Sequence, residues 1–247
     1  MKRIHNIKLK VGYTGTNYHG YQIQPNLVTI EGTLKDAVEK TVKRETRITS
    51  AGRTDRGVHA MGQVVNFYSD TTIDLGNLPR VINYHLPNDI SVLEAKKVPM
   101  EFHSRFDAKA KWYRYIIYNG RYRNPIYHNR AAFIRFPLDV EAMRRSLTPL
   151  PGNRDFKPFM GKYAVVKDTI RTLHNIKIKK QGELIIVDFY GRSFLKNMIR
   201  IIMGTAIQIG RHLQEEEDLI HAIEYQDKSY IGPTADACGL YLMKVEY

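Results

Sequence analysis

The chain has 247 residues, of which 43% are hydrophobic and 26% are charged, and its formal net charge is +13. This length and composition exclude a low-complexity chain and predict a globular protein with a substantial core, as one large domain or two small ones. The basic excess favours a polyanionic partner, of which nucleic acid is the commonest, although surface charge also serves solubility.

The cysteine content and the apolar segments restrict the class of protein further. One cysteine, Cys238, cannot form an internal disulfide, which favours a reducing compartment and predicts a cytoplasmic protein. The N-terminal residues contain no apolar run, so a signal peptide is not predicted. The most apolar segment, 194–209, is interrupted by charged residues and is not predicted to span a membrane. The histidines and the cysteine show no metal-binding spacing, so no metal is expected.

The first half of the chain shows alternating and helical hydrophobic patterns in turn. Strict alternation predicts a strand over 7–13. Apolar residues at every fourth position predict an amphipathic helix over 30–42, with Thr29 as its N-terminal cap. The remaining elements predicted in this half are strands over 47–50, 63–68 and 90–98 and a short helix over 75–85.

The second half repeats this order. Aromatic and β-branched residues predict a strand over 111–118, and a helix follows over 140–147. A hairpin turns around Gln181 and Gly182, between strands over 173–179 and 184–190. The elements predicted after it are a buried helix over 194–209, a helix over 215–225 and a closing strand over 240–247.

Both halves therefore have the β-α-β-β-α-β order, which predicts an α+β fold of two ferredoxin-like halves. Two antiparallel sheets with helices on one face each are expected to form a basic RNA-binding cleft between their other faces. We place the domains at 1–104 and 105–247. The segment 149–168 has little periodicity and is predicted to be either a substrate-contacting loop or a long surface connection.

The stretch GRTDRGVH contains the first candidate for catalysis. It places one carboxylate, Asp55, between Arg53 and Arg56. The glycine spacing matches the start of a phosphate-binding loop, but Val58 and His59 stand where that loop needs lysine and serine or threonine. No G-x-S-x-G motif indicates a serine hydrolase, and no second carboxylate nearby supports a glycosidase. Nearby cations keep an aspartate ionised as a nucleophile or base, and an ion pair that stabilises a surface loop is the alternative.

A second candidate region, 102–136, is rich in both cations and rings. It holds eight lysines and arginines, ten aromatic residues and a single acidic residue, Asp107. Cations bind phosphates, and flat rings stack on exposed bases. Most alternate rings of the strand over 111–118 are expected in the core instead. The signature of the common RNA-recognition module is absent, so the region predicts an RNA-binding surface of another kind.

The stretch AGRTDRGVHAMGQVV closely resembles the active-site motif of the TruA family of tRNA pseudouridine synthases. Five further stretches are similar to motifs of that family in the same order: YTGTNYHGYQIQ, FHSRF, YRYIIYN, FLKNMIRIIMG and GPTADACGLYLMKVEY. The resemblance covers essentially the whole chain. It implies two ferredoxin-like halves that meet at a basic cleft, usually in a homodimer. It also implies isomerisation of uridine to pseudouridine in the anticodon stem-loop of tRNA, at positions 38 to 40, with no cofactor or metal.

The resemblance also implies roles for single residues. The nucleophilic aspartate is Asp55, the tyrosine that stacks on the target base is Tyr113, and the arginine that pairs with the aspartate is Arg200. Whether Asp55 attacks C6 of the base or C1′ of the ribose stays open. The positions implied in RNA binding, with base flipping assigned to the first, are Arg53, Phe102, His103, Ser104, Arg105, Phe106 and Arg121.

Four positions depart from the family pattern. Arg56 replaces a small residue, Thr14 an aspartate, Tyr21 a tryptophan, and Arg192 a small or polar residue. None of these changes removes a catalytic group, but together they leave the target uridines open. The alternatives are a related enzyme that acts on another structured RNA, such as ribosomal RNA, and an RNA-binding protein without activity. The presence of all three residues expected at the catalytic centre argues against the second alternative.

Overall fold

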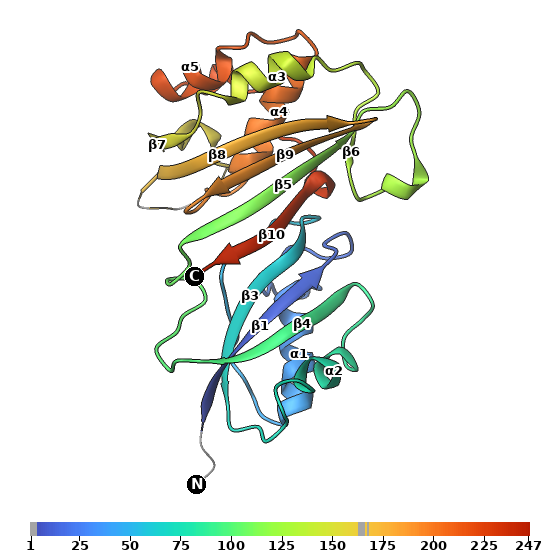
Figure 1. The fold of residues 1–247 in the computed structure, drawn as a ribbon, viewed down its shortest axis with the longest axis vertical. Coiled ribbons are helices and arrows are strands. Elements are labelled where there is room, and N and C mark those ends of the chain that lie inside the picture. The colour runs from blue at the N-terminus through green and yellow to red at the C-terminus, as the bar shows by residue number, and fades with distance from the viewer. Residues whose placement is uncertain (1–3, 163–165, 167) are drawn as a thin grey trace. The chain divides into compact units, whose positions relative to one another are not determined.

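The computed structural model describes residues 4–162, 166 and 168–247 and is an α+β structure, as predicted (Figure 1). By its contacts the chain divides into two compact units. The first consists of the chain up to Lys109 together with Tyr241–Tyr247, and the second is Ala110–Leu240. None of the helices in the described ranges is long and apolar enough to cross a membrane.

The first unit has the predicted β-α-β-β-α-β order. Its elements are β1 (His5–Tyr13), α1 (Ile30–Val42), β2 (Thr49–Ser50), β3 (His59–Ser69), α2 (Leu78–Asn83) and β4 (Ile90–Val98). The antiparallel sheet has the order β4-β1-β3, and β2 pairs with the other edge of β3. The helices α1 and α2 lie together against one face of this sheet (Figure 1).

One edge of β3 pairs with β1, and the other edge pairs with β2 and, nearer the start of β3, with a strand from the end of the chain. The strand β10 (Leu240–Glu246) runs parallel to β3, and the pairing joins Tyr241 to His59 and Leu242 to Ala60. The end of the chain, which follows the second half in sequence, therefore groups with the first unit. β3 also begins four residues earlier than the predicted strand at 63, so that it directly follows the loop that carries Asp55.

Local sequence explains the first elements. Every second residue of β1 from Ile7 to Tyr13 is buried, while Lys8 and Lys10 lie on the opposite face of the strand. The predicted cap of α1 is confirmed, because Oγ1 of Thr29 accepts a hydrogen bond of 3.3 Å from the backbone N–H of Gly32.

The second unit has a four-stranded antiparallel sheet in the order β5-β9-β8-β7, with β6 parallel to one end of β5. Its elements are β5 (Ala110–Tyr118), β6 (Ala132–Phe133), α3 (Val140–Leu147), β7 (Gly152–Asp155), β8 (Ile170–Gln181), β9 (Leu184–Gly191), α4 (Met198–Gly210) and α5 (Asp218–Glu224). The predicted hairpin is confirmed, and Gly182 supplies the left-handed turn residue with φ of 58°. The helices α3, α4 and α5 pack on one another.

The described residues 149–162 contain more regular structure than the weak periodicity of this segment indicates. They include β7, which pairs with β8, and then a 3-10 helix over Lys157–Phe159. The ring of Phe156, which precedes this helix, and that of Phe159, its last residue, are fully buried. The first part of the segment is thus built into the second unit, while 163–165 and 167 lie outside the described residues.

The helix predicted from residue 194 begins at Met198 instead. The preceding residue, Asn197, has φ of 60° in the left-handed region, which a right-handed helix does not accommodate. Nearly all of α4 is buried, in agreement with its apolar sequence on every face.

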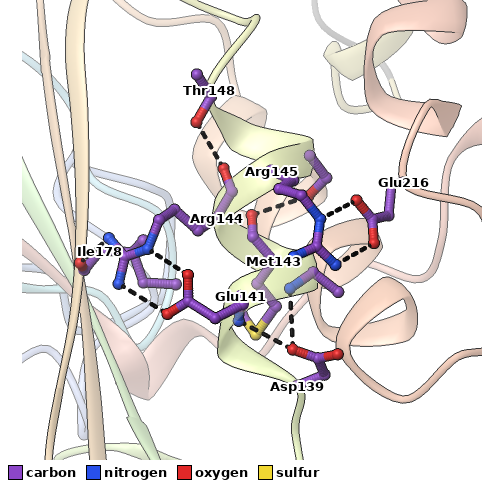
Figure 2. A network of polar contacts seen from close by, with 10 residues as sticks. Asp139, Glu141, Met143, Arg144, Arg145, Thr148, Ile178 and Glu216 are labelled. Atoms are coloured by element: carbon purple, nitrogen blue, oxygen red, sulfur yellow. Dashed lines mark hydrogen bonds and ion pairs between the residues drawn. The ribbon is translucent and has the colours of Figure 1, made fainter.

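Helix α3 is fixed at its start and along both sides (Figure 2). A carboxylate oxygen of Asp139 accepts hydrogen bonds from two backbone N–H groups of the first turn, each of 3.0 Å. Arg144 donates to the carbonyl of Ile178 on β8 (2.8 Å), and Arg145 donates twice to Glu216 (2.6 Å). Exposed ion pairs of this kind contribute only about 0–1 kcal/mol each, so the cap and the buried face of the helix supply most of its stability.

Candidate active site and RNA-binding surfaces

The loop that carries Asp55, residues 51–58, connects β2 to β3 and is anchored through its backbone. The carbonyl of Thr54 accepts a hydrogen bond of 3.0 Å from the N–H of Tyr21, and the carbonyl of Asp55 accepts one of 3.1 Å from the N–H of Val58. The hydroxyl of Thr54 shares a buried hydrogen bond of 2.8 Å with that of Tyr13. These bonds fix the backbone on both sides of the Asp55 side chain.

Two buried tyrosines hold this loop through hydrogen bonds to Thr54. Tyr13 and Tyr21 are both buried, and their ring centroids lie 6.3 Å apart. Burial raises the pKa of Tyr13 to about 12, so its hydroxyl keeps its proton at neutral pH, although its hydrogen bond to Thr54 acts in the opposite direction. Tyr21, which stands where the family pattern has a tryptophan, is therefore buried next to the loop and helps to hold it.

The far end of the loop is packed against Gly15. A Cβ atom on Gly15 would lie 2.0 Å from the carbonyl oxygen of Val58, so only glycine fits at this position. The N–H of Gly15 also donates a hydrogen bond of 3.2 Å to Nδ1 of His59. The His59 ring is 1% exposed and stacks on Tyr241 at 4.7 Å. His59 is thus part of the support of the loop, despite its closeness to Asp55 in sequence.

The charged side chains of the loop differ in their exposure. Asp55 is half-buried, while Arg53 and Arg56 are exposed. The loop therefore presents one carboxylate on an anchored backbone, with an exposed arginine on either side in the sequence. This arrangement suits a reactive aspartate, because the backbone sets its position and the arginines stay available to a phosphate.

Tyr113 lies near the start of the part of β5 that pairs with β9, in the second unit. It pairs with Phe189 of β9, and its ring meets that of Phe194 edge-on, at 5.1 Å and 77°. The side chain is 8% exposed. Burial and the edge-on contact with Phe194 restrict the orientation of the ring.

Arg200 is held by the residues that follow α4 and by the residue that precedes it. Its Nε donates a hydrogen bond of 2.8 Å to the carbonyl of Ala235, and its Nη1 donates one of 3.1 Å to Oδ1 of Asn197. The N–H of Ala235 donates in return to the carbonyl of Arg200 (3.0 Å). Nη2 takes part in neither side-chain bond. The structure thereby brings together two of the stretches that resemble the family, 194–204 and 232–247.

Ser104, predicted to bind RNA, has no exposed surface. Its N–H and its hydroxyl both donate to Oδ1 of Asn66, at 3.0 and 2.5 Å, and its carbonyl accepts a hydrogen bond of 2.8 Å from Tyr247. Phe102 beside it is partly exposed, and its ring packs on Tyr247 at 4.9 Å. Because Ser104 is enclosed, we propose that it positions the FHSRF stretch rather than contacting RNA directly.

The rest of this stretch forms a tight turn with an exposed tip. Nδ1 of His103 accepts hydrogen bonds from the N–H groups of Arg105 (3.1 Å) and Phe106 (3.3 Å). Arg105 is exposed, Phe106 is 74% exposed, and the guanidinium of Arg105 lies 5.6 Å from the centre of the Phe106 ring. Arg121, in the second unit, is likewise exposed and lies 5.3 Å above the ring of Tyr122. Each pair offers a cation and a ring at the surface.

The structure adds a set of lysines that sequence reasoning missed. A hollow of about 230 Å³ on the first unit is lined by Lys8 and Lys10 of β1, Lys96 of β4 and Lys244 of β10. Glu94 lies among them and pairs with Lys96. The alternation of Lys8 and Lys10 with buried residues was the one signal in the sequence, because the other two lysines reach the hollow only through strand pairing.

A protein-family model described as tRNA pseudouridine synthase matches residues 10–107 and 148–247, which carry the Asp55 loop, the FHSRF turn and α4. The chain belongs to this family. The family consists of isomerases that act on tRNA, so the chain is an enzyme of that class.

Curated relatives match along nearly the whole chain. The tRNA pseudouridine synthase A of Pelobacter propionicus is 39% identical over 98% of this chain and 99% of its own length. That of Thermoanaerobacter sp. (strain X514) is also 39% identical, with the same coverage. The protein of the same name from Halalkalibacterium halodurans is 40% identical over 97% of this chain and 90% of its own length.

Proposed function

We propose that this protein converts uridine to pseudouridine in the anticodon stem-loop of tRNA, at positions 38 to 40, with Asp55 as the nucleophile. The observation that supports this most directly is the anchored loop at 51–58. Its buried hydrogen bonds fix the backbone of Thr54 and Asp55, while the carboxylate itself stays partly exposed. Catalysis by positioning needs such a fixed reactive group, because a displacement of about 1 Å can cost about 100-fold in rate.

The proposed reaction begins when the target uridine leaves the RNA helix, at a cost of a few kcal/mol. Tyr113 offers a ring to the flipped base, and Arg53 holds the strand that the base has left. Asp55 attacks either C6 of the base or C1′ of the ribose. The bond between N1 and C1′ breaks, the base turns, and C5 bonds to C1′. The proton is lost from C5, N1 gains a proton, and Asp55 is released unchanged, so the reaction needs no co-reactant.

The remaining charged residues have supporting roles in this proposal. Arg200 supplies a positive charge whose position is set by Ala235 and Asn197. Arg105 and Arg121 are exposed cations that bind phosphates. We assign the same role to the lysines of the hollow on the first unit, because its lining contains four lysines and one side-chain carboxylate, that of Glu94.

We further propose that the protein acts as a homodimer, as the resemblance to the family implies, and in the cytoplasm, as its single cysteine indicates. Sedimentation equilibrium of the purified protein tests the dimer, and a mass of one chain at assay concentrations contradicts it.

A second candidate function is action on another structured RNA, such as ribosomal RNA. It is favoured by Arg56, which is exposed beside Asp55 where the family has a small residue. An arginine there reaches a phosphate or base that the family pattern leaves without a partner. The same assay separates the two candidates when it includes tRNA and ribosomal transcripts side by side.

The experiment is the substitution Asp55→Asn, assayed on unmodified transcripts by carbodiimide-dependent stops of reverse transcription. We expect pseudouridine formation to fall by more than about 1,000-fold while RNA affinity stays near that of the wild type, because an amide has the same shape but is not nucleophilic. Asp74→Asn, on an exposed loop of the same unit, is the matched control and should keep full activity. Turnover within tenfold of the wild type would contradict the role of Asp55.

A further inference from the structure

A hollow of about 660 Å³ lies in the second unit, and the proposed reaction does not use it. It is lined by Tyr118 at the end of β5, by residues between 123 and 133, and by residues 236–238. Its volume falls within the range of about 300–1,000 Å³ that is usual for sites that bind small organic groups. The hollow is therefore large enough for one nucleotide.

Three rings beside the hollow form a stack. The centroids of Tyr118 and Tyr127 lie 5.0 Å apart with 27° between their planes, and those of Tyr118 and Phe133 lie 6.1 Å apart with 26° between them. Rings held nearly parallel are the arrangement on which unstacked bases are bound in single-stranded nucleic acid. The hydrogen bond of 2.8 Å from the Tyr118 hydroxyl to Glu183 fixes the central ring.

The segment that forms one side of the hollow is basic. Residues 119–138 include four arginines and no acidic residue. Arg123 lines the hollow, and its guanidinium lies 4.7 Å above the ring of Phe133. Among the described lining residues Asp236 is the one acidic residue, and Glu183 lies next to them through its hydrogen bond with Tyr118. A guanidinium held flat on a ring keeps its N–H groups available at its edge, where they can bind a phosphate.

We propose that this hollow binds an unstacked nucleotide of the RNA substrate other than the uridine that is isomerised. The proposal rests on the proposed function, since it takes its RNA from there. Tyr113, assigned to the target base, and Tyr118 are five residues apart on the same strand, a distance of roughly 16 Å at the rise of a β-strand. One base cannot contact both rings. Both faces of Tyr118 are covered by Tyr127 and Phe133, so the second base stacks on the outer face of the half-exposed Tyr127, and Arg123 binds its phosphate.

Two exposed or half-exposed positions test the proposal, Arg123→Gln and Tyr127→Leu. Arg80→Gln, an exposed arginine on α2 in the first unit, is the matched control. An unmodified tRNA transcript is titrated against each variant, and thermal unfolding confirms that each folds. We expect affinity to fall by about tenfold in each of the two variants, by the usual size of one stacking or phosphate contact, with the maximal rate unchanged. The control should bind like the wild type.

Photocrosslinking gives a direct readout. A transcript that carries 4-thiouridine is irradiated with the wild-type protein, and the labelled peptides are identified by mass spectrometry. We expect a label on a peptide within 118–133. Affinities equal to that of the control, together with labels confined to other peptides, would overturn the proposal. So would a change of oligomeric state in Arg123→Gln with unchanged RNA affinity, because that assigns the hollow to a second copy of the chain.

Failure of this proposal is distinguishable from failure of the proposed function. If the wild-type protein makes pseudouridine while Arg123→Gln and Tyr127→Leu keep full affinity and the crosslinks lie on other peptides, only the proposal for the hollow is refuted. Wild-type protein that makes no pseudouridine in any transcript refutes the proposed function, while the crosslinks still report whether RNA occupies the hollow.

Discussion

The loop at 51–58 and the segment at 119–136 both carry arginines, but they are held by different forces. The loop is fixed by hydrogen bonds to buried groups and by the close approach of Gly15, and little of its backbone is free to move. In the segment, the guanidinium of Arg123 lies over the ring of Phe133 and that of Arg135 over the ring of Phe136. A reactive group needs a fixed position, whereas a surface that follows an RNA chain gains from side chains that can adjust.

Among the variants that test this comparison, Gly15→Ala is expected to have the largest effect on stability, and it tests how firmly the loop is fixed. The new methyl group would overlap the carbonyl of Val58, and that backbone would have to move. We expect the free energy of unfolding to fall by about 3 kcal/mol or more, and the maximal rate by about 100-fold. Urea unfolding and single-turnover pseudouridine formation measure the two effects.

Gly12→Ala is the matched control, three residues earlier in the same segment. Its Cβ would lie 3.4 Å from Leu93, an ordinary contact. This variant should stay within about 1 kcal/mol of the wild type. Equal losses in the two variants would show that the close approach at Gly15 has no special role in fixing the loop.

The next effect concerns the buried hydrogen bond between Thr54 and Tyr13. Thr54→Val keeps the shape of the side chain but removes its hydroxyl, and we expect a loss of about 1–3 kcal/mol in the free energy of unfolding. The double variant Thr54→Val with Tyr13→Phe should lose less than the sum of the single variants, because no hydroxyl of the pair is then left without its partner. Urea unfolding of all four proteins measures this, and strict additivity would show that the two groups are not coupled.

A smaller effect is expected from the exposed arginines. Arg105→Ala and Arg121→Ala should each weaken RNA binding several-fold and reduce the slope of log Kd against log salt concentration by about 1, because each removes one phosphate contact. Filter binding between 50 and 200 mM salt, roughly the range in which counterion release dominates, measures both quantities. An affinity that does not change with salt in the wild type would contradict binding through phosphates.

The smallest effect on rate is expected from Arg56→Ala. Arg56 is exposed, so solvent screens its charge, and the substitution should change the maximal rate by less than about threefold. The preference among tRNA and ribosomal transcripts should shift instead. Assays at saturating and limiting RNA separate the two quantities. A maximal rate that collapses on every RNA, at unchanged affinity, would place Arg56 in the chemistry.

The sequence alone predicted most of the fold, because hydrophobic periodicity is a local property. The strand over 90–98 and the helices over 30–42 and 140–147 have the predicted bounds, since their apolar residues recur at the period of the element. Periodicity did not reveal β7 or the start of α4. The first is a short strand that exists because β8 pairs with it, and the second is set by the left-handed conformation of Asn197.

The sequence by itself also determined the family, the basic character of the protein and the candidate residues, since these depend on which side chains are present and in what order. Only the tertiary structure decided which of them are exposed and which residues distant in sequence meet. It encloses Ser104 against Asn66, leaves Arg105 at the surface, and brings Lys244 to Lys8 and Lys96 through the pairing of strands. Burial and convergence of this kind arise from packing between segments far apart in the chain, which no local pattern of residues encodes.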